Sequence, residues 1–327
     1  AHAISPGYGT IHVGGDIMRI SAGNDTTWSH VAWSSEEGHL EFGRGLTGGD
    51  VECFQLKDSF LWIGGSFTHA DGVHSEGLVE QGSGGGYFAV NSAVTPQEVR
   101  DMTIHNNGLY LIADEGTPTD HVWRVRHYGG GQWGAPLGGD FTDGLNAIFS
   151  HTDGDLYVAG FFKRGVVRWD DGEWVHLGGG IGTIHHDRHW FKGIVSFEGA
   201  DIAAGDNVRL PAVLDGQYDC QNVVRWDGDA WHRMADGIGN QVIGLAVYDD
   251  QLYAGVRSSY FSLENVERWD GEEWQPSGLA TGQLLCLAVH GDDLVAGGHF
   301  TAMDEVPVGR VAAFDGAVWR ALGTGMD

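Results

Sequence analysis

Short apolar runs alternate with polar turns along the whole chain, and the runs come in pairs. The run 245–247 is followed after a polar turn by the run 252–255, and 287–289 is followed by 294–298 in the same way. Runs of this length, bounded by Asp and Gly, are typical of β-strands rather than helices. The pattern therefore predicts an all-β chain.

A second pattern, Arg-Trp-Asp-Gly followed by another Trp, separates these pairs of strands. It occurs at 225–231 and 268–274, with an extra Asp at 168–174 and as a weaker copy at 312–319. Each copy predicts two short strands around an Asp-Gly turn, which is a strong hairpin signal. Copies of the combined repeat start near residues 31, 77, 122, 166, 222, 266 and 310.

A four-strand repeat copied along a whole chain is typical of a β-propeller. The last copy runs off the C-terminal end, and strands that would complete it are found at 3–5 and 11–15. We therefore expect one domain over residues 1–327, a single seven-bladed β-propeller with four antiparallel strands per blade. Its last blade is expected to be completed by residues 1–30.

The repeat signatures resemble those of a known group of proteins. The Arg-Trp-Asp-Gly copies, together with Gly-Gly-x-Phe-Thr at 64–68 and 297–301, are similar to Kelch-type and related bacterial surface propeller repeats. The resemblance covers essentially the whole chain, but these residues turn hairpins and pack blades. Since one fold serves many functions, the resemblance leaves binding, scaffolding and enzymatic roles open.

Charge and composition exclude some classes of binding partner. The chain has 45 acidic and 18 basic residues, a formal net charge of −27, and its three lysines do not cluster. Nucleic acid is therefore not an expected partner, because neutralising phosphates needs clustered basic residues. No apolar run is long enough to span a membrane. Cys53, Cys220 and Cys286 form neither a disulfide framework nor a zinc pattern. Separately, we expect the protein to be an extracellular or periplasmic monomer.

Irregular loops point to one face of the propeller. The regular Asp-Gly hairpins share one face, whereas the longer connections emerge on the other, where one repeat carries an insertion divided between 178–189 and 206–222. Loops held by a rigid scaffold often carry function. The residues expected to contact a ligand there are His185, His189, Tyr218, Tyr260 and Phe261.

The inserted loop also holds a cluster of potential metal ligands. His185, His186, Asp187 and His189 fall within five residues, and these side chains can bind a divalent metal ion or supply a general base. Consecutive loop histidines cannot all face one ion, so a solvated loop without metal is the alternative.

Aligned starts of the innermost strands predict a second cluster around the central channel. Glu52 and Asp101 are candidate acid and base, Arg100 and Lys192 are candidate carboxylate ligands, and His2 is a candidate proton shuttle. The alternative is that these charges pair across neighbouring blades, for instance Glu52 with Arg100. His186 completes the list of candidate catalytic residues.

Two functions follow from these features. The favoured hypothesis is a secreted or cell-surface binding propeller that recognises a glycan or a protein through the irregular face. The alternative is a carbohydrate-active enzyme, a polysaccharide hydrolase or lyase, with its site at the channel mouth. A scaffold without a small-ligand site is the third possibility, and the sequence leaves open whether the protein is an enzyme.

Overall fold

The fold is seen in a computed structural model. It describes residues 3–7, 10–19, 27–34, 38–40, 45–82, 86–90, 96–151, 154–161, 165–178, 181, 190–206, 208, 210, 222–258 and 264–322. For residues up to 40, and for 190 and 264, only the backbone is described.

All the regular structure in these residues is β-structure, and none of it is helical. The chain forms antiparallel sheets that follow one another along the sequence. The first is β1 (Ala3–Gly7), β2 (Thr10–Arg19), β3 (Thr27–Ser34) and β4 (Gly38–Leu40). The second is β6 (Val51–Lys57), β7 (Phe60–Gly65), β10 (Leu78–Gln81) and β11 (Tyr87–Ala89).

The next three sheets continue this order. The third is β12 (Glu98–His105), β13 (Gly108–Asp114), β14 (Trp123–Gly129) and β15 (Gln132–Trp133), with β16 (Leu137–Phe141) on β14. The fourth is β17 (Leu145–Ser150), β18 (Leu156–Gly160), β19 (Val166–Asp170) and β20 (Glu173–His176). The fifth is β21 (Trp190–Phe197), β22 (Ala200–Asp206), β23 (Val223–Trp226) and β24 (Trp231–Arg233).

Two more sheets and a small hairpin sheet complete the described chain. The sixth sheet is β25 (Gln241–Tyr248), β26 (Gln251–Arg257), β27 (Glu264–Trp269) and β28 (Trp274–Ala280), extended by β31 (Ala302–Met303) and β32 (Val306–Pro307). The seventh is β29 (Gln283–His290), β30 (Asp293–His299), β33 (Val311–Phe314) and β34 (Trp319–Ala321). The small sheet is β5 (Leu46–Thr47), β8 (His69–Ala70) and β9 (Val73–His74).

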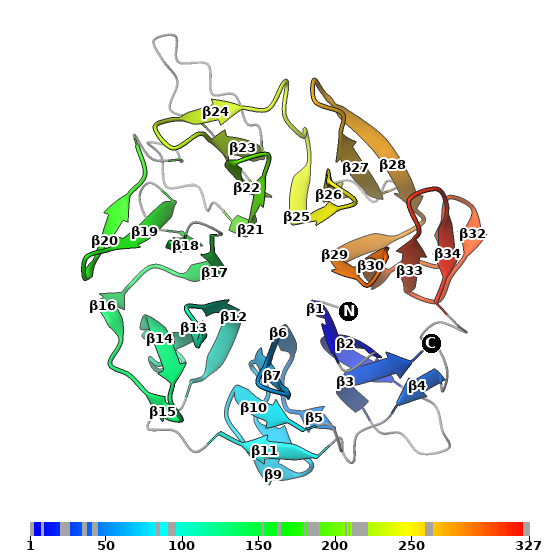
Figure 1. The fold of residues 1–327 in the computed structure, drawn as a ribbon. Coiled ribbons are helices and arrows are strands. Elements are labelled where there is room, and N and C mark those ends of the chain that lie inside the picture. The colour runs from blue at the N-terminus through cyan, green and yellow to red at the C-terminus, as the bar shows by residue number, and fades with distance from the viewer. Residues whose placement is uncertain are drawn as a thin grey trace.

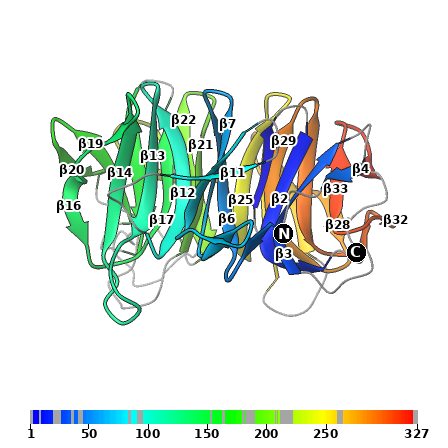
Figure 2. The same ribbon diagram turned by 90° about the horizontal axis from the view of Figure 1, so that it is seen from below.

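The sheets are arranged around a common centre, as in a β-propeller (Figure 1). Their innermost strands follow one another in the order β1, β6, β12, β17, β21, β25 and β29, and each packs against the next, with β29 packing against β1. Figure 2 shows the sheets side by side, with their strands running roughly along the axis of the ring. The expected all-β propeller architecture is therefore observed.

The two ends of the chain meet differently from the expectation. A sheet shared between residues 310–327 and 1–30 is not found in the described segments, because β1–β4 and β29–β34 already form separate sheets. The sequence repeat starts at the third strand of a sheet, so counting from that strand divides each sheet between two copies. β2 pairs antiparallel with both β1 and β3, and the ends meet instead through packing of β1 against β29.

Hydrophobic clusters between adjacent sheets form the core. Trp169 and Trp226 lie in such clusters, as expected for blade-packing aromatic residues. Two tryptophans also bond across the interface: the indole N–H of Trp174 donates to the carbonyl of Leu137 at 3.0 Å, and that of Trp319 donates to Ser277 at 2.9 Å. No described segment forms a helix with the length and hydropathy that a membrane crossing would require.

Candidate functional site

A β-bulge recurs near the start of the innermost strand in six of the described sheets. Each bulge skips one residue in the ladder with the next strand, for example Glu52 between Val51 and Cys53. A bulge leaves its extra residue unpaired and redirects the side chain. The six skipped residues, here called the bulge ring, are Glu52, Arg100, Asn146, Lys192, Ile243 and Leu285.

The bulge ring contains three of the residues that the sequence placed at the channel mouth: Glu52, Arg100 and Lys192. Their equivalence follows from the bulges themselves, since each occupies the same position in its strand. Asp101 follows directly after the bulge of β12. The ring is mixed in character, because Ile243 and Leu285 complete it with apolar side chains.

Arg100 is held by partners on three sides. Its guanidinium makes a two-pronged ion pair with Glu98, at 2.9 Å from Nε to Oε1 and 3.1 Å from Nη2 to Oε2. Nη1 donates to the side-chain oxygen of Asn146 at 2.9 Å, and the group lies 4.1 Å from the ring centroid of Trp123. Such two-pronged and cation–π contacts fix the orientation of an arginine. The structure therefore gives Arg100 a fixed position between the third and fourth sheets.

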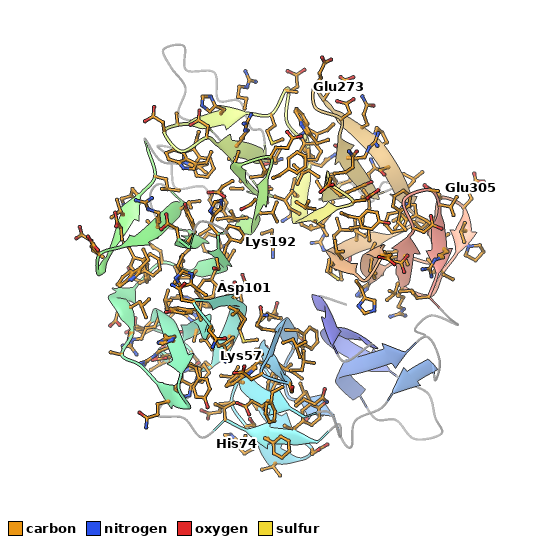
Figure 3. All side chains as sticks on the ribbon, viewed as in Figure 1. Lys57, His74, Asp101, Lys192, Glu273 and Glu305 are labelled. Carbon is orange, nitrogen blue, oxygen red and sulfur yellow. The ribbon has the colours of Figure 1, made fainter. Side chains whose placement is uncertain are left out.

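Lys192 extends from the inner end of its sheet toward the centre of the ring (Figure 3). Its side chain is solvent-exposed, yet the surrounding protein lowers its pKa through desolvation. Glu52 opposes this change, whereas Arg100 and Arg257 lower the pKa further. Charges from three other sheets thus act on this amino group, which makes Lys192 the centre of the site.

Asp101 is part-buried where two inner strands approach each other. Its Oδ1 accepts the main-chain N–H of Met102 at 2.9 Å, and its Oδ2 accepts that of Ile148 on β17 at 2.8 Å. Burial raises the pKa of Asp101 to about 7, although both N–H bonds favour the ionised form. Both carboxylate oxygens therefore have main-chain partners, which gives Asp101 a structural role.

The remaining predicted site residues lie outside the described residues. These are His2, His185, His186, Asp187, His189, Tyr218, Tyr260 and Phe261. Within the described part of the chain, no group of three or more His, Cys, Asp or Glu side chains is arranged to hold a metal ion.

Sequence reasoning missed Glu98, Trp123 and Arg257. Glu98 could have been found from the strand period, because residues two apart on a strand share a face. Arg257 was harder to find, since it lies at the far end of the second strand, opposite Gln241. Trp123 contacts Arg100 from the third strand of the sheet, and its position in the sequence gives no sign of this.

Comparison with known proteins shows the fold. No family model matches the chain, and no curated protein matches its sequence. A catalytically inactive virginiamycin B lyase from Staphylococcus aureus, solved with quinupristin, is similar with a TM-score of 0.60 and 9% identity over 93% of this chain and 91% of the lyase.

Two further solved structures share the architecture. The β-propeller domain of the trilobed protease from Pyrococcus furiosus has a TM-score of 0.53 and 10% identity over 98% of this chain and 95% of that one. YCF48 bound to D1 peptide has a TM-score of 0.53 and 14% identity over 84% and 82%. At these identities the likeness shows a β-propeller fold and nothing about activity.

Proposed function

We propose that the protein is a secreted or cell-surface binding propeller that recognises a carboxylate-bearing glycan at the bulge ring. The observation that carries this proposal is the exposed ammonium group of Lys192 at the inner end of its sheet, close enough to Arg100 and Arg257 for both to affect its pKa. A positively charged group attracts a ligand of the opposite sign. A uronate carboxylate has the matching charge.

The other members of the bulge ring suit the rest of a sugar. Glu52 is half-buried and supplies carboxylate oxygens for hydroxyl groups, while Ile243 and Leu285 supply an apolar wall. Polar and apolar side chains at one site can bind both the hydroxyl groups and the C–H faces of a sugar. Tyr218, Tyr260, Phe261 and the histidines at 185 and 189 would extend this site along the irregular face.

The propeller architecture is compatible with this role. The similar solved structures include a lyase with quinupristin and a propeller with a bound peptide, so related architectures hold ligands of different classes. We further infer that the chain is one domain over 1–327, with seven blades of Kelch-type repeats. The packing of β1 against β29 supports closure of that ring. A divalent ion at His185, His186, Asp187 and His189 stays a prediction.

Co-elution with soluble polysaccharides tests the proposal. The protein is mixed with polygalacturonate or with neutral dextran, and both components are followed by size-exclusion chromatography. We expect polygalacturonate to co-elute intact, and Lys192→Gln to abolish this co-elution. Lys57→Gln is the matched control, because Lys57 lies at the opposite end of an innermost strand. Equal binding of polygalacturonate by Lys192→Gln and by the natural protein would refute a glycan site at Lys192. If the protein binds other proteins and no polysaccharide, its ligand is a protein and not a glycan.

The second candidate is a carbohydrate-active enzyme, and one observation favours it. Asp101 has a pKa raised to about 7, which is the range expected of a general acid or base. Its two main-chain hydrogen bonds argue against a free catalytic group, which is why binding is preferred. Shortening of polygalacturonate in the same chromatography, lost in Glu52→Gln, would instead establish the enzyme.

A further inference from the structure

A separate cleft lies between the fourth and fifth sheets. It has a volume of about 430 Å³ and is reached from the hairpin turns at Gly199 and Gly228, which follow the ends of β21 and β23. Lys192 lies near the start of β21, so the cleft is at the opposite end of the sheets from the bulge ring. The cleft therefore forms a second concavity on the regular face, distinct from the proposed glycan site.

Its floor is a buried histidine–aspartate pair. Nε2 of His151 lies 2.9 Å from Oδ1 of Asp201, and the two side chains are only 14% and 5% exposed. Ser196 donates a longer hydrogen bond to the same carboxylate oxygen at 3.4 Å. The ring of His151 contacts the rings of Phe149 and Tyr157 edge-on. Both partners are thus held in fixed positions by residues of two sheets.

The wall of the cleft also carries an arginine that is paired with two carboxylates. Arg168 lines it and pairs with Asp155 at 3.0 Å and with Asp170 at 3.2 Å. These bonds orient the guanidinium and offset its charge. The arginine therefore contributes fixed donors to the cleft without making it a strongly positive site.

Asp227, on the β23–β24 turn, lies at the rim of the cleft. Its Oδ1 accepts the main-chain N–H groups of Asp229 and Ala230, both at 2.9 Å, and its Oδ2 lies 2.6 Å from Nε2 of His232. The main-chain bonds lower the pKa of Asp227 to about 2. The neighbouring Trp226 adds an aromatic edge to the lining.

These features together select a class of ligand. Fixed donors and acceptors lie around one small cleft, and the charged groups described above already have hydrogen-bonding partners within the protein. An anion would meet the carboxylates of Asp201 and Asp227, while a cation would meet the guanidinium of Arg168. A neutral ligand with several hydroxyls avoids both conflicts, because each hydroxyl can donate to a carboxylate and accept from an arginine. Its C–H faces would contact the aromatic edge of Trp226.

We propose that this cleft is a binding site for a neutral sugar ring. It is independent of Lys192 and of the acidic glycan proposed above, because the two sites lie at opposite ends of the sheets and share no residue. A protein with both sites would bind two sugars on its two faces.

Saturation-transfer NMR with maltose, lactose and cellobiose tests the proposal on the full chain. We expect at least one of these disaccharides to bind, and Asp201→Asn to weaken that binding about tenfold, because a charge-assisted hydrogen bond to a hydroxyl is lost. Lys192→Gln should leave it unchanged, which separates this site from the bulge ring. No binding by any of the three sugars at about 10 mM, a concentration that reveals even millimolar affinity, would overturn the proposal.

A matched pair of turn variants tests the proposal even if Asp201→Asn fails to fold. Asp227 and Asp315 cap equivalent turns, since Oδ1 of Asp315 also accepts two main-chain N–H groups at 2.9 Å. Only Asp227 lines the cleft. We expect Asp227→Asn to weaken sugar binding several-fold and Asp315→Asn to leave it unchanged. Equal effects of the two variants, or stronger binding of putrescine than of any sugar, would refute a neutral-sugar site.

Discussion

The side chain of Asp101 joins two neighbouring sheets through the main chain of Ile148. Its Oδ2 accepts the Ile148 N–H at 2.8 Å, across the line where β12 and β17 pack together. At the equivalent position after the bulge, the other sheets have small residues: Cys53, Ala147, Gly193, Gly244 and Cys286. A Cβ on Gly193 would be in ordinary van der Waals contact, 3.8 Å from the nitrogen of Leu245. Among the residues at this position in these six sheets, Asp101 alone carries a carboxylate.

This arrangement predicts that Asp101→Asn destabilises the fold. Both carboxylate oxygens accept main-chain N–H groups, and an amide replaces one acceptor by an NH₂ group that faces a donor. Leaving a buried N–H without a partner costs about 1–3 kcal/mol. Urea unfolding at about pH 4, where the folded-state carboxyl group is protonated and the substitution removes no buried charge, should show a loss of this size. Unchanged unfolding free energy would mean that the contact with Ile148 contributes nothing.

The raised pKa of Asp101 predicts a pH dependence of stability. Its pKa is about 7 in the folded protein against an ordinary value of 3.8, so the folded state binds more protons than the unfolded chain between these values. The contribution of this group is fully present below about pH 4 and is lost as pH rises to about 7. The unfolding temperature of the natural protein should fall as pH rises across this range. The slope of unfolding temperature against pH should be smaller in Asp101→Asn. Identical slopes in the two proteins would contradict the assignment.

The architecture was readable from the sequence, whereas the closure of the ring was not. Asp-Gly turns and apolar strand pairs are local signals, so they predicted the all-β propeller. The repeat signature begins at the third strand of each sheet, so its starts do not mark where a sheet begins. The contact between the two ends is long-range, since β1 packs against β29.

The candidate site was predictable only in part. Aligning strand starts identified Glu52, Arg100 and Lys192, because each repeat places its bulge at the same point. Their partners could not be predicted in this way, since the contact of Arg100 with Trp123 depends on how the strands of one sheet curve around it. The pair of His151 with Asp201 likewise joins two sheets across an interface, and neither residue belongs to a recognisable motif.

The contact of Trp319 with the preceding sheet leaves no room for a side chain larger than glycine at position 278. A Cβ on Gly278 would lie 2.4 Å from Nε1 of Trp319, whose N–H donates to Ser277. Gly278→Ala should therefore displace the indole and destabilise the protein by about 1–3 kcal/mol, as overpacking usually does.

Gly239→Ala is the matched control for this substitution. No atom lies within 4 Å of the Cβ that it would add, and its unfolding free energy should change by less than about 0.5 kcal/mol. Chemical denaturation of the two variants side by side measures both effects. Equal stability of Gly278→Ala and Gly239→Ala would show that the contact with Trp319 is not tight in solution.

The lowered pKa of Lys192 predicts how binding of an acidic glycan depends on pH. A carboxylate is held only while the amino group is protonated, and desolvation together with Arg100 and Arg257 brings its deprotonation below the ordinary value of 10.5. Affinity for polygalacturonate should therefore fall with rising pH, and the fall should begin below the pH at which an ordinary lysine loses its proton. Lys192→Arg should retain binding at that pH, because a guanidinium stays charged, and isothermal titration of both proteins measures the difference. If both proteins lose affinity in parallel, the titrating group is not Lys192, and the glycan site must be sought elsewhere on the irregular face.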